Sequence, residues 1–147
     1  MDGGIRMKIT AEVLMGIWLL LCSFQDIKEK KISIFLIASG GLLLSVAFLI
    51  IGGVPGISRL SGLLLGLLLF ASGRMLKGQI GDGDSMIICI TGICLGFIKN
   101  INLMLLGLSL TALMSLFLLI FKKAGPKDTI PFVPFLFLSY LGGIFLS

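Results

Sequence analysis

The chain has 147 residues, of which 57% are hydrophobic and only 13% are charged, and its mean hydropathy is +1.16. A soluble domain of this composition would leave too much apolar surface in contact with water. The apolar runs approach or exceed the ~18–20 residues that a membrane-spanning helix needs, and they lack the alternation typical of transmembrane β-strands. We therefore expect an all-α, polytopic membrane protein.

Twelve lysines and arginines outnumber seven aspartates and glutamates, which gives a net charge of +5, and the chain contains no histidine. In a membrane protein this excess marks cytoplasmic loops and contacts with the anionic head groups of the lipid bilayer. Because no basic stripe with interleaved aromatic residues is present, we expect no nucleic-acid partner. The lack of histidine removes the commonest general base and the commonest metal ligand.

The three cysteines, Cys22, Cys89 and Cys94, all lie inside apolar stretches and show no Cys-x-x-Cys spacing. This placement is typical of small buried hydrophobic residues and argues against a zinc site or a disulfide framework. We expect no metal and no cofactor.

Six apolar spans follow one another, and they predict a bundle of about six transmembrane helices in a single domain over residues 1–147. The expected spans are Ile9–Gln25, Ile32–Ile51, Ile57–Met75, Ser85–Ile98, Ile101–Phe121 and Ile130–Leu146. No small-x-small cleavage site follows the first span, so we expect a retained helix and not a signal peptide. The short connection Ile98-Lys99-Asn100-Ile101 predicts a tight antiparallel hairpin between the fourth and fifth spans.

The basic residues divide unequally between the two sides of the membrane. The side reached after the first, third and fifth spans carries Lys28, Lys30, Lys31, Arg74, Lys77, Lys122, Lys123 and Lys127. The opposite side carries Arg6, Lys8, Arg59 and Lys99. Because short cytoplasmic loops collect lysine and arginine, we expect the first set in the cytoplasm and both termini outside.

Glycines recur at four-residue spacing in two spans, Gly62 and Gly66 in the third and Gly92 and Gly96 in the fourth. Small residues at this spacing let helix backbones approach closely in lipid, where packing drives helix association. We expect these glycines to support tight packing of the bundle and not to line a channel.

Two carboxylates stand at the membrane boundary: Asp26 after the first span, and Asp84 at the end of Gly81-Asp82-Gly83-Asp84. Ionisable groups near the hydrocarbon core are costly and mark candidate functional sites. Both follow an odd-numbered span, so we expect them at the same face of the membrane. A converging pair would form an aspartic dyad, in which one carboxyl keeps a proton while the other activates water. Residue types alone favour a simpler interpretation, with Asp84 as a helix N-cap, Asp82 as a turn residue and Asp26 solvated.

Three separated segments are similar to motifs of one known family. Asp26-Ile27-Lys28-Glu29-Lys30-Lys31-Ile32 resembles the segment after the first helix of type IV prepilin peptidases. Gly81-Asp82-Gly83-Asp84, followed by an apolar run with Gly92, resembles that family's Gly-x-Gly-Asp motif. Ile130-Pro131-Phe132-Val133-Pro134-Phe135-Leu136 resembles the element at the start of its last helix. The three segments occur in the family's order and cover nearly the whole chain.

This resemblance implies a membrane-embedded aspartic endopeptidase in a single transmembrane domain, with Asp26 and Asp84 as the catalytic pair. The residues that match the family's structural motifs are Gly81, Gly83, Pro131 and Pro134. The implied substrates are prepilins or pseudopilin-like membrane proteins of type IV pilus or secretion systems. Their short basic leader would be removed at the cytoplasmic face of the cytoplasmic (inner) membrane.

Other positions bear on substrate choice. Asp82 falls at the variable position of its motif, and with Glu29 we expect it to attract the basic leader of a substrate. The resemblance is incomplete where Ser33-Ile34, Met86 and Val133 replace the usual Pro-Asn, Lys and Gly. Larger members of the family carry a cytoplasmic segment with paired Cys-x-x-Cys motifs, which is absent here, so we expect no methyltransferase activity.

Two other interpretations remain open. Intramembrane proteases of the presenilin kind also use Gly-x-Gly-Asp, but they are longer and hold their carboxylates deeper in the spans. A non-enzymatic cation or proton conduit, or an assembly scaffold, could use Asp26, Asp82 and Asp84 as oxygen ligands for a divalent ion. Such a conduit should place acids along the interior of the spans, where Glu12 is almost alone.

Overall fold

The computed structural model describes residues 2–29, 33–51, 53–77, 82–122 and 132–146. These ranges contain six α-helices and no β-strand. In chain order the helices are α1 (Asp2–Glu29), α2 (Ile34–Ile51), α3 (Gly56–Met75), α4 (Asp82–Leu95), α5 (Phe97–Ile120) and α6 (Val133–Leu146). The expected all-α architecture of about six helices is therefore confirmed.

The helices differ in how far they can reach across a bilayer. Four of those described, α1, α2, α3 and α5, are long and apolar enough to span a membrane. By contrast, α4 and α6 have 14 residues each. At 1.5 Å per residue such a helix is about 21 Å long, shorter than the ~30 Å of the hydrocarbon core. The fourth expected span, Ser85–Ile98, was already short for a full crossing, and the described part of α4 has the same length.

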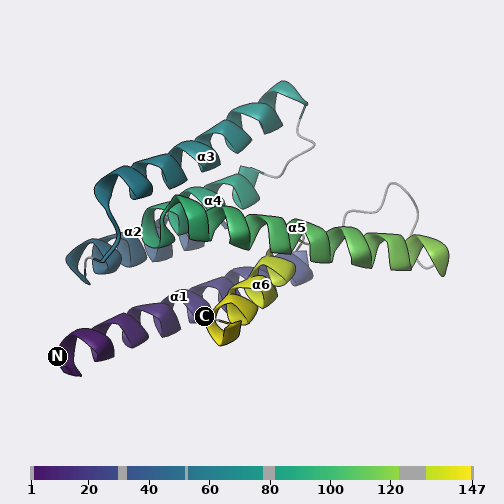
Figure 1. Ribbon diagram of the computed structural model, residues 1–147. Helices are drawn as coiled ribbons and strands as arrows, with labels where there is room; N and C mark the ends of the chain where they lie inside the picture. The colour runs from purple at the N-terminus through teal and green to yellow at the C-terminus, as the bar shows by residue number, and fades with distance from the viewer. Residues whose placement is uncertain (1, 30–32, 52, 78–81, 123–131, 147) are drawn as a thin grey trace.

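Successive helices run in alternating directions (Figure 1). One end of the bundle consequently holds the C-terminal ends of α1, α3 and α5 and the N-terminal ends of α2, α4 and α6. We call this the carboxylate end, because Asp26 lies in the last turn of α1 and Asp84 in the first turn of α4. The other end is called the N-terminal end.

Each of the short helices α4 and α6 packs against two or three of the longer ones. Helix α4 packs against α2, α3 and α5, and α6 packs against α1 and α5. The core side chains include Met15, Leu19, Leu44, Ile87 and Leu136, all almost completely buried. Large apolar side chains also cover the outside, above all on α5, which suits a surface in contact with lipid.

Glycines bring α3 and α4 into backbone contact. A Cβ added at Gly62 would lie 2.5 Å from the carbonyl oxygen of Gly92, and one at Gly66 would lie 2.5 Å from Sγ of Cys89. The distance between the two helices thus depends on the absence of side chains at these positions. The expected tight packing is confirmed for Gly62, Gly66 and Gly92.

The junction between α4 and α5 lies earlier than expected. Gly96 alone separates the two helices, with a φ of 85° that favours glycine, whereas residues 98–101 belong to α5. The side chain of Asn100 is buried, donates to the carbonyl of Ile88 (3.1 Å) and accepts from the hydroxyl of Thr91 (2.6 Å). The predicted tight antiparallel hairpin between α4 and α5 is confirmed (Figure 1), but its turn lies at Gly96 and not at Lys99-Asn100, because these hydrogen bonds satisfy the amide of Asn100 inside the bundle.

Arg59 was expected among the loop charges, but it lies in the first turn of α3 and is only 7% exposed. Its guanidinium donates to three main-chain carbonyls, those of Phe48 (2.8 Å), Val54 (3.2 Å) and Ile93 (3.2 Å). Phe48 and Ile93 lie in the last turns of α2 and α4, where carbonyls lack partners within their own helix. Arg59 therefore joins three helices at the N-terminal end of the bundle.

Candidate functional site

Asp26 lies in the last turn of α1 and is buried, with 7% of its surface exposed. Its Oδ2 accepts a hydrogen bond of 3.2 Å from the main-chain N–H of Val133. Val133 is the first residue of α6 and is completely buried. The first N–H groups of a helix have no partner within the helix and form the positive end of its dipole. Asp26 thus satisfies the N-terminus of a helix 107 residues further along the chain.

Asp84 lies on α4, which runs antiparallel to α1 (Figure 1). It lies in the first turn of α4, one of the two helices too short to span, and its side chain is half-buried. A negative charge is favourable at this position because the first turn is the positive end of the helix dipole. The structure begins α4 at Asp82, two residues before Asp84, so Asp84 lies inside the first turn and not at the cap.

The charge of Asp26 acts on Asp84. Burial raises the pKa of Asp84 to about 7, and the negative charge of Asp26 contributes to that increase. Two carboxylates held together resist ionising both at once, so the pair keeps one proton more easily than two separate groups would. A carboxyl with a pKa of about 7 is partly protonated near neutral pH. The simpler interpretation of Asp26 as a solvated residue is therefore wrong.

A hydrogen bond joins the pair to α6. Within the described residues, the N–H of Val133 provides the single hydrogen bond to these two side chains. Ionised carboxylates in proteins commonly accept several hydrogen bonds, which stabilise the charge.

The other acidic candidates lie outside this pair. Asp82 and Glu29 are both exposed, although each is close in sequence to a member of the pair. The described residues contain no group of three His, Cys, Asp or Glu side chains that could hold a metal ion.

The motif residues are only partly described. Gly83 is half-buried in the first turn of α4, and Pro134 is the second residue of α6. A helix accepts proline in its first turn, because the missing N–H has no intrahelical partner there. The predictions for Gly81 and Pro131 fall outside the described residues.

The three cysteines of the chain are free thiols. Cys22 lies one turn before Asp26 on α1, is free of disulfide bonds and is completely buried. Cys94 is likewise free and buried, whereas Cys89 is half-buried against α3. The prediction that the cysteines act as small buried residues is confirmed for Cys22 and Cys94.

Sequence reasoning did not identify Val133 as a partner of the pair. The only signal was that the segment from Ile130 to Leu136 formed the third of three separated motifs. The structure brings part of each motif to the carboxylate end: Asp26 from the first, Asp84 from the second and Val133 from the third. Comparison of the chain with protein-family models, curated proteins and solved structures finds no match.

Proposed function

We propose that this protein is a membrane-embedded aspartic endopeptidase in which Asp26 and Asp84 form the catalytic pair. The observation that carries the proposal is the raised pKa of Asp84 on α4, to which the buried Asp26 on α1 contributes, while Asp26 accepts a hydrogen bond from the N-terminus of α6. A pKa of about 7 for Asp84 supplies a protonated carboxyl at physiological pH, and its partner supplies the base.

In the proposed reaction, one member of the pair removes a proton from water while the water attacks the scissile carbonyl. The other member, protonated at the start, donates to the carbonyl oxygen, and a later proton transfer releases the amine. No covalent acyl-enzyme forms, because neither carboxyl acts as the nucleophile. Acid and base roles belong to the pair as a unit, since the two groups share their protons.

The proposed substrates are membrane proteins of the prepilin or pseudopilin kind, with a short basic leader ahead of an apolar helix. The apolar helix would lie in the bilayer beside the enzyme, which places the leader junction at the membrane surface. The exposed carboxylates Asp82 and Glu29 lie close in sequence to the pair and offer negative charge to a basic leader.

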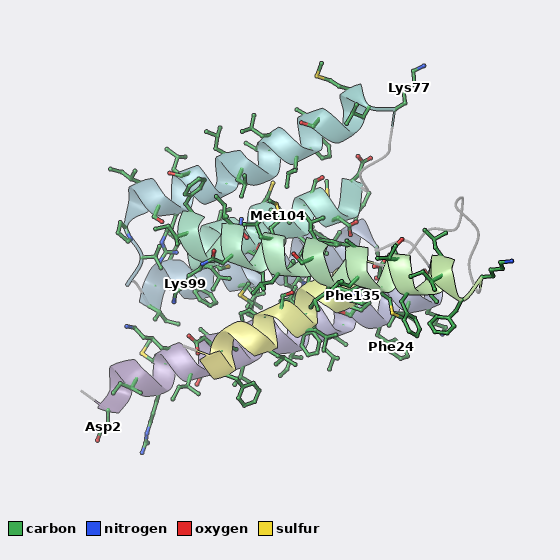
Figure 2. All side chains as sticks on the ribbon, turned by 45° about the vertical axis from the view of Figure 1, so that its right-hand side comes forward. Asp2, Phe24, Lys77, Lys99, Met104 and Phe135 are labelled. Atoms are coloured by element: carbon green, nitrogen blue, oxygen red, sulfur yellow. The ribbon has the colours of Figure 1, made fainter. Side chains whose placement is uncertain are left out.

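The proposed location of the site is the cytoplasmic face of the cytoplasmic membrane. Several described basic residues, Lys28, Arg74, Lys77 and Lys122, lie at or near the helix termini of the carboxylate end. Basic residues near the ends of spans favour the cytoplasmic side of the membrane. Figure 2 shows Lys77 and Phe24 at this end of the molecule, away from Asp2.

The direct test is co-expression with a prepilin-like substrate, followed by gel electrophoresis to detect a leader-sized change in mobility. Wild-type protein should convert the substrate, whereas Asp26→Ala and Asp84→Ala should leave it uncleaved at equal expression and membrane insertion. Asp82→Ala is the matched control, because it removes an exposed carboxylate two residues from Asp84. Substantial cleavage by Asp84→Ala would contradict the proposal.

A further inference from the structure

A cavity at the N-terminal end of the bundle is separate from the proposed catalytic pair. It has a volume of about 230 Å³ and lies between α1, α5 and α6. The residues that line it and enter the argument are Glu12, Lys99, Leu103, Leu106, Tyr140 and Ile144. Glu12 precedes Asp26 by 14 residues on the same helix, which corresponds to about 21 Å along its axis. Figure 2 likewise shows Lys99 toward the end that holds Asp2, far from Phe24.

Two opposite charges line this cavity. Glu12 belongs to α1 and Lys99 to the first turn of α5. Within the described residues, neither charged group takes part in an ion pair, and the two do not pair with each other. An ionisable side chain in a membrane-spanning helix is costly and normally serves a purpose. Glu12 is only half-buried, and the proposed peptidase mechanism does not use it.

The position of Glu12 is held from α6. The hydroxyl of Tyr140 donates to the main-chain carbonyl of Glu12 at 2.9 Å, and Tyr140 is itself buried. This hydrogen bond uses the backbone of Glu12 and leaves its carboxylate out of the contact. This hydrogen bond therefore fixes α1 against α6 beside the cavity. The side-chain carboxylate of Glu12 is left to contact a ligand.

The rest of the lining is largely apolar, with Leu103, Leu106 and Ile144 beside the two charges. A ligand that complements this lining needs a cationic group, an anionic group and a hydrocarbon portion. The volume is smaller than the ~300–1,000 Å³ of pockets that enclose whole drug-sized ligands, so the cavity accommodates only part of a larger molecule. A lipid with its head group at the charges and its chains in the bilayer meets these requirements.

We propose that this cavity binds one zwitterionic phospholipid with a primary amine, of the phosphatidylethanolamine kind. Its ammonium group would contact Glu12, and its phosphate would contact Lys99. A primary ammonium offers three N–H donors to a carboxylate, whereas the quaternary ammonium of phosphatidylcholine offers none. A quaternary ammonium is typically held by several aromatic faces, whereas the described residues that line the cavity include one aromatic side chain, Tyr140.

The test compares lipid retention in the full-length protein. The protein is reconstituted with equal amounts of phosphatidylethanolamine, phosphatidylcholine and phosphatidylglycerol of matched acyl chains, then released into mild detergent for native mass spectrometry. Wild type should retain one phosphatidylethanolamine at least about fivefold more often than either competitor, as expected for one favourable charge contact. Equal retention of the three lipids by the wild type would overturn the proposal without any reference to a variant.

Two variants separate the two contacts. Glu12→Gln should reduce phosphatidylethanolamine retention to that of phosphatidylcholine, and Lys99→Gln should reduce retention of all three phospholipids. Matched controls are Asp2→Asn and Lys122→Gln, which remove exposed charges outside the cavity and should retain lipid as the wild type does. Unchanged selectivity in Glu12→Gln would overturn the proposal.

A soluble zwitterion is the remaining possible source of the same head group. Glycerophosphoethanolamine carries the amine and the phosphate without acyl chains, and we expect it not to displace the retained lipid. Displacement by this compound would show that the cavity selects the head group alone, and it would overturn the assignment to a membrane lipid.

Discussion

The two ends of the bundle both bury charge close to helix termini, but they treat it differently. At the N-terminal end, the guanidinium of Arg59 donates to three main-chain carbonyls, including those of Phe48 and Ile93 in the last turns of their helices. At the carboxylate end, the described residues provide one hydrogen bond, from the N–H of Val133, to Asp26 and Asp84 together.

Under the proposed function, this difference separates a structural charge from a catalytic one. A buried cation with several partners is stabilised in its charged form and holds the surrounding helices in place. At the other end, burial and the negative charge of Asp26 raise the pKa of Asp84 to about 7. Substitutions at the first end should therefore affect stability, and substitutions at the second should affect chemistry.

The largest expected effect follows from removing either member of the pair. Asp26→Asn and Asp84→Asn should each lower the rate of leader cleavage at least ~10³-fold, because acid and base are needed in the same step. The measurement is cleavage of a prepilin-like substrate by purified protein in detergent or lipid. Asp82→Asn serves as the control and should retain a rate within a fewfold of wild type.

Replacing Arg59 should lower the stability of the protein and leave its cleavage activity per folded molecule unchanged. Arg59→Met leaves three carbonyls without their donor and should reduce the free energy of unfolding by about 2–4 kcal/mol. Thermal unfolding in detergent measures this change, with Arg74→Met, at an exposed arginine, as the matched control. Cleavage per folded molecule should remain close to wild type. A selective loss of cleavage at unchanged stability would contradict the separation of roles.

The glycine contact between α3 and α4 allows a smaller test of structural packing. Gly62→Ala places a methyl group 2.5 Å from the carbonyl oxygen of Gly92, so the helices must move apart at a cost of about 1–3 kcal/mol. Gly142→Ala is the matched control within a helix, since nothing lies within 4 Å of its added Cβ. Equal thermal stability of the two variants would contradict this packing.

The pH dependence of cleavage reports on the pair directly. The pKa of Asp84 is raised from 3.8 to about 7, so the carboxyl keeps its proton at lower pH and loses it as the pH rises through 7. Above that value both groups are ionised and no acid remains, so the rate should fall about tenfold per pH unit. A rate that stays constant up to pH 9 would argue against a shared proton.

The smallest expected effect concerns the exposed acids. Asp82→Lys should weaken the preference for a basic leader by only about two- to fivefold, because exposed charge contacts are screened by solvent. The comparison uses substrates whose leaders differ only in their number of lysines. If charge reversal leaves the dependence on leader charge unchanged, Asp82 takes no part in attracting the substrate.

Sequence patterns predicted the helices better than their ends. Continuous apolar runs predicted the six helices. Such a run contains no polar residue that shows where a buried helix ends. Lys99 and Asn100 looked like a turn, although Asn100 is buried and the break lies at Gly96. That distinction depends on partners in α4, which a linear sequence does not show.

The site was predicted in part. Counting spans placed Asp26 and Asp84 at one face of the membrane, and the structure brings them close enough for Asp26 to raise the pKa of Asp84. The contact between Val133 and Asp26 joins residues 107 positions apart, and neither hydropathy nor local spacing encodes such a pairing. Arg59 was misplaced for the same reason, since its three carbonyl acceptors become available only when α2, α3 and α4 meet.

The most direct test of the pair is a double-mutant cycle on single-turnover cleavage, with wild type, Asp26→Asn, Asp84→Asn and the double variant. Groups that act as one unit are not additive, so we predict that the double variant cleaves no more slowly than either single variant. Independent, multiplying losses at the two positions, or a single variant that cleaves at a rate near wild type, would contradict a shared catalytic pair.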